Sequence, residues 1–146
     1  MNESFSVRLA HWPEDTAMLR QVRETVFIQE QHVPADIEWD GIDAECIHAL
    51  AMSRDGSPVG TGRLLRDGHI GRMAVLREWR KLGVGSQMME LLMAEARRRH
   101  YPCLALNAQV SAVPFYARFG FVTRGDEFEE AGIPHLEMIL PLTQEP

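Results

Sequence analysis

The sequence predicts an α/β fold in which a mixed, mostly antiparallel sheet of about six to seven strands is flanked by helices. Its 146 residues are 45% apolar and 25% charged, values typical of one globular domain that buries its own core. Short apolar or alternating segments, separated by turns rich in glycine and proline, predict the strands. Two longer segments with apolar residues three and four positions apart predict the main helices. We therefore expect residues 1–146 to form a single domain.

The first half of the chain predicts a strand, a helix and an antiparallel meander. Residues 5–10 alternate apolar and polar side chains, as a half-buried strand does. Residues 14–31 have helical spacing, and Val33-Pro34 disfavours further helix. Three further strands are predicted at residues 46–53, 59–65 and 70–76. The segment Arg54-Asp55-Gly56-Ser57 is typical of a hairpin turn, so neighbouring strands are expected to pair antiparallel.

The second half predicts a long helix, a short helix and three more strands. Residues 84–100 have an apolar stripe that ends before Pro102. Ser111 is a suitable N-cap for the short helix, and Gly120 is suited to close it in a left-handed conformation. The strands are predicted at residues 103–108, 121–124 and 136–142. The resulting order is β-α-β-β-β-α-β-α-β-β.

Composition excludes several classes of protein. No apolar run approaches the roughly 20 residues that span a bilayer, and the N-terminus lacks the features of an export signal, so we expect a cytoplasmic protein without membrane association. Cys46 and Cys103 are interpreted as small buried hydrophobic residues. No His, Cys and Asp spacing fits a metal site. A net charge of −6 without a basic run argues against nucleic-acid binding.

Charge is unevenly distributed along the chain. Residues 24–53 contain seven carboxylates and no lysine or arginine, whereas residues 54–99 contain ten basic and five acidic residues. One interpretation is that these charges lie on solvated faces. The other is that a site for a cationic group adjoins a site for an anionic one.

A loop with two glycines joins the strand at residues 70–76 to the long helix. Free amides at a helix start favour phosphate, and Gly83 and Gly85 allow close approach of the backbone. Arg80, Lys81 and Ser86 add two positive charges and a hydroxyl group. The loop matches neither the Walker A motif nor the dinucleotide-binding fingerprint. The first requires a Gly-Lys pair and the second requires a third glycine, and both are absent here. The alternative is a turn whose glycines have only a steric role.

The segment Arg80-Lys81-Leu82-Gly83-Val84-Gly85 resembles the R/Q-x-x-G-x-G/A signature of the GNAT superfamily of N-acyltransferases. The segment Asn107–Phe121 (NAQVSAVPFYARFGF) resembles the closing motif of the same superfamily, N…A-x-x-F-Y-x-x-x-G-F. The order of predicted elements also matches that fold over almost the whole chain. Residues 26–33 and 130–135 resemble the small bacterial ElaA-type branch.

The resemblance implies acetyl-CoA as co-substrate and assigns roles to individual residues. Backbone groups of the strand before the signature would pair with the pantetheine arm, and the signature loop would bind the pyrophosphate. Asn107 would contact the cofactor arm, and Tyr116 would protonate the departing thiolate. A buried tyrosine whose hydroxyl is satisfied locally is the structural alternative. The implied cofactor-binding residues are Met73, Ala74, Val75, Arg80, Lys81, Leu82, Gly83, Val84, Gly85, Ser86 and Asn107.

The implied reaction is acetyl transfer to a primary amine by direct attack in a ternary complex. An alkyl amine with a pKa near 10.4 is protonated at pH 7, so attack needs a base or a proton path, which contributes about 10²–10⁴-fold. The sequence does not choose among the carboxylates of the acidic segment and two histidines; the candidates are Glu30, Glu38, Asp40, Asp43, Glu45, His48 and His135. We expect Glu30, Glu38, Asp40 and His135 to bind a cationic substrate.

Three rival functions remain open at this point. The first is a non-catalytic sensor or interaction module that binds acyl-CoA on the same fold. The second is an enzyme that uses a longer acyl group, and the third is a purely structural domain. Edge strands of this architecture are able to pair between chains, so a homodimer is one expected assembly.

Overall fold

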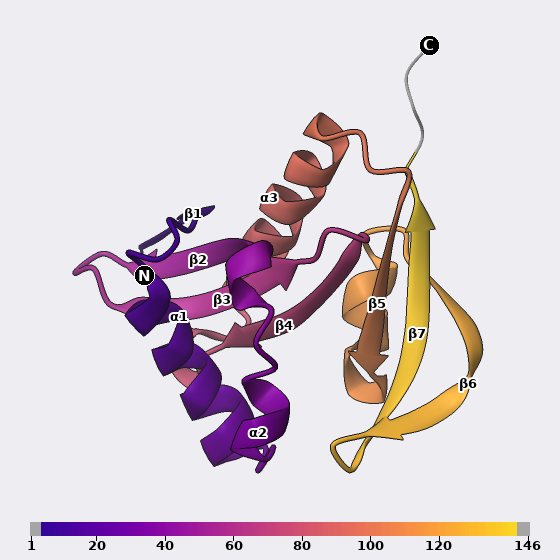
Figure 1. Cartoon of the computed structure of the whole chain (residues 1–146), viewed down its shortest axis with the longest axis horizontal. Helices are drawn as coiled ribbons and strands as arrows, with labels where there is room; N and C mark the ends of the chain where they lie inside the picture. The colour runs from indigo at the N-terminus through magenta and orange to yellow at the C-terminus, as the bar shows by residue number, and fades with distance from the viewer. Residues whose placement is uncertain (1–3, 143–146) are drawn as a thin grey trace.

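A computed structural model describes residues 4–142 and contains a seven-stranded sheet with the order β1-β2-β3-β4-β5-β7-β6 (Figure 1). The strands are β1 (Phe5–Leu9), β2 (Ile47–Ser53), β3 (Pro58–Leu64), β4 (His69–Val75), β5 (Cys103–Gln109), β6 (Val122–Glu130) and β7 (Ile133–Pro141). Strands β4 and β5 pair in parallel, and every other pair is antiparallel. The predicted fold class and order of elements are confirmed.

Helices cover both faces of the sheet. The helices are α1 (Thr16–Arg23), α2 (Ala35–Glu38), α3 (Val84–Arg98) and α4 (Val113–Ala117). Helix α1 continues as a π-helical segment, η1 (Glu24–Glu30), so the predicted helix at 14–31 forms with a wider final turn. Ala74 of β4 packs against α1 and η1, whereas its neighbours Met73 and Val75 pack against the cluster that contains α3. Because side chains alternate along a strand, α1 and α3 lie on opposite faces.

The main core lies between α3 and strands β2–β5. Ala49 and Ala51 on β2 are fully buried, and Met88 and Leu92 of α3 are buried in the same cluster. The helix approaches β3 so closely that a Cβ atom on Gly60 would lie 3.0 Å from Val84 Cγ1. This packing fixes the start of α3 against the sheet and thereby positions the loop before it.

Strand β4 is bulged and then separates from β5. Thr61 pairs with Ala74 and Arg63 pairs with Gly71, so two residues of β4 lie opposite one residue of β3. Arg72, at the bulge, has a φ of 51°. Strands β4 and β5 are in register only at His69↔Ala105 and Ile70↔Leu106. Beyond these pairs the two strands diverge (Figure 1), which leaves one edge of β4 without a partner strand.

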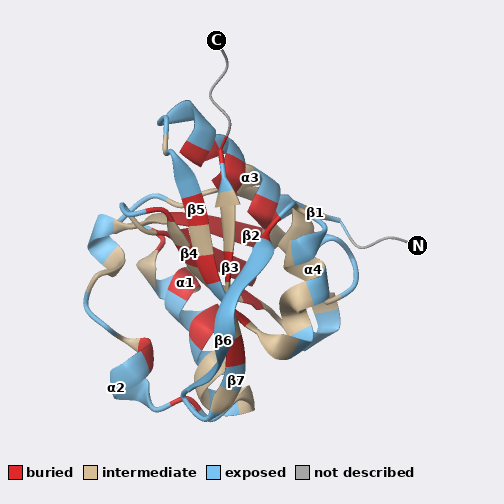
Figure 2. Cartoon of the chain, turned by 90° about the vertical axis from the view of Figure 1, so that its right-hand side faces the viewer, coloured by how far each residue is buried: buried red, intermediate tan, exposed pale blue. Residues whose placement is uncertain are grey.

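Strand β6 differs from the prediction of residues 121–124. It extends to Glu130 and forms a long hairpin with β7, and every residue of β6 is exposed (Figure 2). The pairing with β7 is interrupted between Arg124 and Phe128, and Gly125 has a φ of 83°. This bulge interrupts the alternation of side chains between the two faces of the strand. The sequence pattern therefore predicted only the first part of β6.

Two smaller predictions are wrong. Ser111 does not cap a helix, because it lies inside a 3₁₀ turn (Val110–Ala112) and the N-cap of α4 is Ala112, which makes no side-chain capping bond. Cys103 is exposed rather than buried, because the alternation of β5 places Leu104 in the core and Cys103 on the other side. Cys46 is half-buried. Between residues 4 and 142, no helix is long and apolar enough to cross a membrane.

Candidate functional site

A cavity of about 530 Å³, here called the loop cavity, lies between the free edge of β4, the loop before α3 and helix α4. Its lining residues are Val26, Gln31, Met73, Ala74, Val75, Trp79, Arg80, Lys81, Gly83, Val84, Gly85, Ser86, Ala112, Phe115, Tyr116 and Arg118. Nine of the eleven predicted cofactor-binding residues are in this set. Leu82 is exposed and Asn107 lies elsewhere, so neither lines the loop cavity.

The start of helix α3 presents free backbone amides to the loop cavity. Gly83 is the N-cap residue with a φ of 91°, and it makes no side-chain capping bond. Helix geometry leaves the amides of Val84, Gly85 and Ser86 without acceptors inside the helix. Lys81 is exposed and forms no ion pair with any residue between 4 and 142. The positive end of the helix dipole and this ammonium group together favour an anion such as a phosphate.

Gly85 keeps the wall of the loop cavity open. A Cβ atom at this position would lie 3.4 Å from Phe115 Cζ and 3.9 Å from Val75 Cγ2. A larger side chain would therefore extend into the space between α3 and α4. The open space beside Gly85 fits a cofactor arm that passes close to the backbone.

The unpaired edge of β4 provides backbone hydrogen-bonding groups to the loop cavity. The Leu76 amide donates to the Val59 carbonyl on β3 over 2.9 Å. Because successive peptide groups of a strand point in opposite directions, the amide and carbonyl of Val75 face the side from which β5 has diverged. The Val75 carbonyl accepts a hydrogen bond from Arg80 Nε at 2.9 Å, which leaves the Val75 amide free.

Arg80, the first residue of the signature loop, is held by Glu30. Its Nη1 and Nη2 atoms each donate to a Glu30 carboxylate oxygen over 2.8 Å. The hydrogen bond from Arg80 lowers the pKa of Glu30. Glu30, at the end of η1, thus connects this helical segment to the loop, and the charge of Arg80 neutralises its carboxylate. Glu30 lines neither cavity. Its predicted contact with a cationic substrate stays a prediction.

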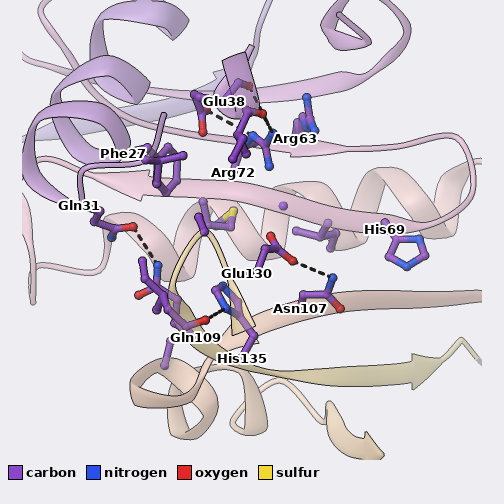
Figure 3. A pocket seen from close by; sticks show the side chains of 18 of the residues that line it. Phe27, Gln31, Glu38, Arg63, His69, Arg72, Asn107, Gln109, Glu130 and His135 are labelled. Carbon is purple, nitrogen blue, oxygen red and sulfur yellow. Dashed lines mark hydrogen bonds and ion pairs between the residues drawn. The ribbon is translucent and has the colours of Figure 1, made fainter. Parts of the chain in front are cut away.

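A second cavity of about 350 Å³, here called the sheet cavity, lies where β4 has separated from β5 and β7 (Figure 3). Glu38, Arg63 and Arg72 lie along one side of it, and Asn107, Glu130 and His135 lie along the other. The walls therefore carry both signs of charge. The amide group of Gln109 bridges to Gln31, with its Nε2 atom donating to Gln31 Oε1 at 2.9 Å.

Four of the seven carboxylates of the acidic segment form ion pairs with arginines, namely Glu30, Glu38, Asp40 and Asp43. Arg23 Nε donates to Glu38 Oε2 at 2.7 Å, and Arg63 Nη2 lies 2.5 Å from Asp40 Oδ2. Burial raises the pKa of Glu38, whereas the hydrogen bond from Arg63 lowers the pKa of Asp40 to about 2. Arg72 also donates to Asp40 Oδ2, at 3.2 Å. Arginines outside the segment thus neutralise four of its carboxylates, whereas Glu24, Asp36 and Glu45 form no ion pair within residues 4–142. Asp40 does not line the sheet cavity.

Glu130 differs from these carboxylates because it forms no ion pair within residues 4–142. It is exposed at the sheet cavity and accepts a hydrogen bond from Asn107 Nδ2 at 3.4 Å. The contact of Asn107 is therefore with a wall of the sheet cavity, and its predicted contact with the cofactor arm stays a prediction. Glu130 was not among the candidate residues from the sequence.

His135 lies in the wall formed by β7 and is only 6% exposed. Its Nδ1 atom is 2.7 Å from the Ile133 carbonyl oxygen. The ring of Phe128 on β6 stacks against it with a centroid distance of 5.9 Å. His48, the other histidine proposed as a base, is 3% exposed and lines neither cavity.

Tyr116 lines both cavities. The residues common to the two linings are Gln31, Met73, Ala112 and Tyr116. Burial raises the pKa of the Tyr116 phenol to about 12, so the phenol is protonated at neutral pH. Phe115 and Phe121 contact its ring edge-on. The arrangement places a proton donor where the contents of the two cavities would meet.

Gln109 and Glu130 of the sheet cavity were not predicted from the sequence, whereas Asn107 and His135 were. Gln109 is two residues from Asn107 on β5, and it pairs in register with His135 on β7. This juxtaposition depends on pairing between segments far apart in the chain. The two-residue spacing of Asn107 and Gln109 predicts that both side chains lie on one face of a strand, but it does not predict which strand pairs with it. Within residues 4–142 no group of three or more His, Cys, Asp or Glu side chains is placed to hold a metal ion.

A family model described as "Acetyltransferase (GNAT) domain" matches residues 14–142. The curated Bacillus subtilis protein "Uncharacterized N-acetyltransferase YjcF" is 42% identical over 122 residues, which cover 81% of this chain and 86% of that protein. The crystal structure of an acyl-CoA N-acyltransferase from Pseudomonas aeruginosa superposes with a TM-score of 0.81 at 32% identity, covering 93% of this chain and 99% of the other. Escherichia coli ElaA superposes with a TM-score of 0.77 at 28% identity, with coverage of 92% and 98%.

Proposed function

This chain belongs to the GNAT superfamily of acetyltransferases, and from that premise we propose that it transfers an acetyl group from acetyl-CoA to a primary amine of a small molecule or peptide. The transfer proceeds by direct attack of the amine on the thioester while both substrates are bound. The observation that carries the proposal is the shared wall of the two cavities at Tyr116.

The loop cavity is the proposed acetyl-CoA site. The amides of Val84, Gly85 and Ser86 and the ammonium group of Lys81 bind the pyrophosphate, because they form an uncompensated positive end of helix α3. The pantetheine arm pairs with the free edge of β4 at Met73–Val75, where the Val75 amide has no partner strand. The thioester then reaches Tyr116.

The sheet cavity is the proposed acceptor site. An ammonium group of the substrate lies near Glu130, the carboxylate of this cavity that is not paired with an arginine. The polar amides of Gln31 and Gln109 provide further hydrogen-bonding groups. Orientation of the amine against the thioester supplies much of the rate enhancement, since it removes the entropy cost of bringing the two together.

Tyr116 is the proposed acid of the second half of the reaction. When the C–N bond has formed, the C–S bond breaks and the sulfur leaves with negative charge. The Tyr116 phenol donates its proton to this thiolate and regains one from the nitrogen of the product. A phenol that remains protonated at neutral pH is in the form that this role requires.

Substitution of Gly85 tests the assignment of the loop cavity. Gly85→Val adds methyl groups beside Phe115 in the space proposed for the cofactor, so we expect the Kd for acetyl-CoA in a calorimetric titration to rise about 100-fold or more, a free-energy loss of about 3 kcal/mol. Ala94→Val is the matched control, because Ala94 lies on the exposed side of the same helix. If both variants bind acetyl-CoA as the wild type does, the loop is only a turn and the proposal fails.

A further inference from the structure

The surroundings of His135 hold its ring in one orientation and select one tautomer of the neutral ring. A carbonyl oxygen can only accept a hydrogen bond, so the 2.7 Å contact with Ile133 requires the hydrogen of the neutral ring to be on Nδ1. The other nitrogen, Nε2, then carries a lone pair. Phe128 stacks on the ring at an interplanar angle of 24° and limits its rotation. A hydrogen bond of this kind at Nδ1 is how proteins commonly prepare Nε2 to accept a proton.

The lone pair at His135 Nε2 is available to a ligand. This atom makes no hydrogen bond within residues 4–142, and it is not among the polar side-chain atoms that are both sealed from solvent and unpartnered. His135 as a whole is buried and lines the sheet cavity. A buried residue with one accessible nitrogen in a cavity wall directs that nitrogen into the cavity.

The other groups considered as bases are occupied or distant. Glu38 is paired with Arg23, and Glu30 is paired with Arg80. His48 Nε2 contacts the Asp43 carbonyl at 2.8 Å, and its ring is stacked against Trp12 outside both cavities. Glu130 forms no ion pair within residues 4–142, but it is exposed at the cavity, where an ammonium group binds without needing to lose its proton. His69 also lines this cavity, but its side chain is 43% exposed and its Nδ1 atom lies 3.0 Å from Asp67 Oδ1. His135 is the buried histidine of the sheet cavity, and its Nε2 atom has no hydrogen-bond partner within residues 4–142.

We propose that His135 is the general base that removes a proton from the acceptor amine through Nε2. This inference rests on the proposed acetyltransferase function and adds a residue to it. A substrate ammonium group loses one proton to Nε2, the lone pair of the resulting amine forms the C–N bond, and the C–S bond then breaks. The thiolate takes the Tyr116 proton, the amide nitrogen returns a proton to Tyr116, and His135 releases its proton to solvent. The acetyl group thus moves from sulfur to nitrogen and the nitrogen loses two protons. One of these replaces the proton that Tyr116 gave to the CoA thiolate, and the other reaches solvent through His135.

The test uses a substitution that keeps the hydrogen bond to Ile133. In His135→Asn the side-chain amide is able to donate to the Ile133 carbonyl in place of Nδ1–H, but nothing replaces Nε2. We expect kcat to fall by about 10²–10⁴-fold, while the calorimetric Kd for acetyl-CoA stays within about threefold of the wild type. In His135→Ala, added imidazole should restore part of the lost kcat, which a purely structural role would not produce. His100→Asn, at an exposed position in the turn after α3, is the matched control.

The outcomes separate this inference from the function on which it rests. Wild-type turnover with an unchanged kcat in His135→Asn overturns the role of His135 and leaves the acetyltransferase function intact. A kcat loss in Glu130→Gln that exceeds the loss in His135→Asn overturns it as well and transfers the role to Glu130. Absence of wild-type turnover with every amine, despite tight acetyl-CoA binding, means that the proposed function itself fails and the inference falls with it.

Discussion

Tyr116 combines aromatic packing with a position in the walls of both cavities. It is packed between the rings of Phe115 and Phe121, and it faces both cavities at once. Apolar packing raises its pKa to about 12, so the hydroxyl keeps its proton until a strong acceptor arrives beside it. The hydroxyl makes no hydrogen bond within residues 4–142, so the structural alternative of a locally satisfied tyrosine receives no support there.

Removal of the Tyr116 hydroxyl tests the acid role at the residue scale. In Tyr116→Phe the ring packing is kept and only the proton donor is lost, so we expect kcat to fall by about 10²-fold with a smaller change in the Kd for acetyl-CoA. Thiol release under saturating acetyl-CoA measures the first quantity, and calorimetry measures the second. Tyr101→Phe is the control, because Tyr101 lines neither cavity. Equal kcat values for the two variants would remove Tyr116 from the mechanism.

Arg80 shows how a matching motif residue acquires a different partner in the folded chain. The spacing of the signature places its charge beside the proposed phosphate site, yet its guanidinium group is occupied by Glu30 and the Val75 carbonyl. Arg80 therefore acts first as a brace between η1, β4 and the loop. Lys81, whose charge is unpaired within residues 4–142, is the better candidate for direct contact with the phosphates.

At the scale of elements, Asp15 connects β1 to the start of helix α1. Its carboxylate accepts from Arg8 Nη1 at 2.8 Å and from the backbone amide of His11 at 2.7 Å. The hydrogen bond from Arg8 lowers the pKa of Asp15 to about 2. The carboxylate is buried, although Arg8 is partly exposed, so solvent reduces the strength of the ion pair. Helix α1 carries η1 and α2 after it, so this connection supports one side of the site.

Asp15→Asn should therefore reduce stability without changing acetyl-CoA binding. We expect a loss of about 1–2 kcal/mol in the free energy of unfolding at pH 7, measured by denaturant titration, with Glu14→Gln, an exposed neighbour, as the control. Because the folded pKa lies below the unfolded one, the contribution is fully present above the unfolded pKa of about 3.9 and is lost as pH falls toward about 2. A difference between wild type and variant that was as large at pH 2 as at pH 7, or a loss equal to that in the control, would contradict this account.

The divergence of β4 and β5 is the element-scale feature that creates the site. Strands β4 and β5 pair at two positions only. The bulge at Arg72 shifts the pairing of β4 with β3 just after these positions, where β4 separates from β5. Side-chain periodicity predicted a strand at residues 70–76 but carried no sign of the bulge. A single residue with positive φ inside a strand depends on the pairing around it, and here Arg72 is held by the Ile37 and Glu38 carbonyls.

At the scale of the whole molecule, local patterns predicted the elements and their order, because helix and strand periodicities depend on near neighbours in the chain. The π-helical end at Glu24–Glu30 and the long β6–β7 hairpin were not predicted, since both deviate from regular periodicity. The acidic segment suggested a site for cations, yet Arg23, Arg63 and Arg72 form ion pairs with three of its carboxylates, Glu38, Asp40 and Asp43. The glycines, Lys81 and Tyr116 were identified from the motifs, whereas Glu130 required the tertiary structure.

The most direct measurement of the central claim is thiol release from acetyl-CoA by the wild-type protein against a panel of primary amines. The panel should include monoamines, polyamines, aminoglycosides and lysine-containing peptides, with a blank that lacks amine. The account predicts that free CoA thiol appears only when an amine is present and that it rises in proportion to acetylated product. Tight acetyl-CoA binding without amine-dependent thiol release from any member of the panel would contradict it, and would assign the fold to a sensor that binds acyl-CoA without turnover.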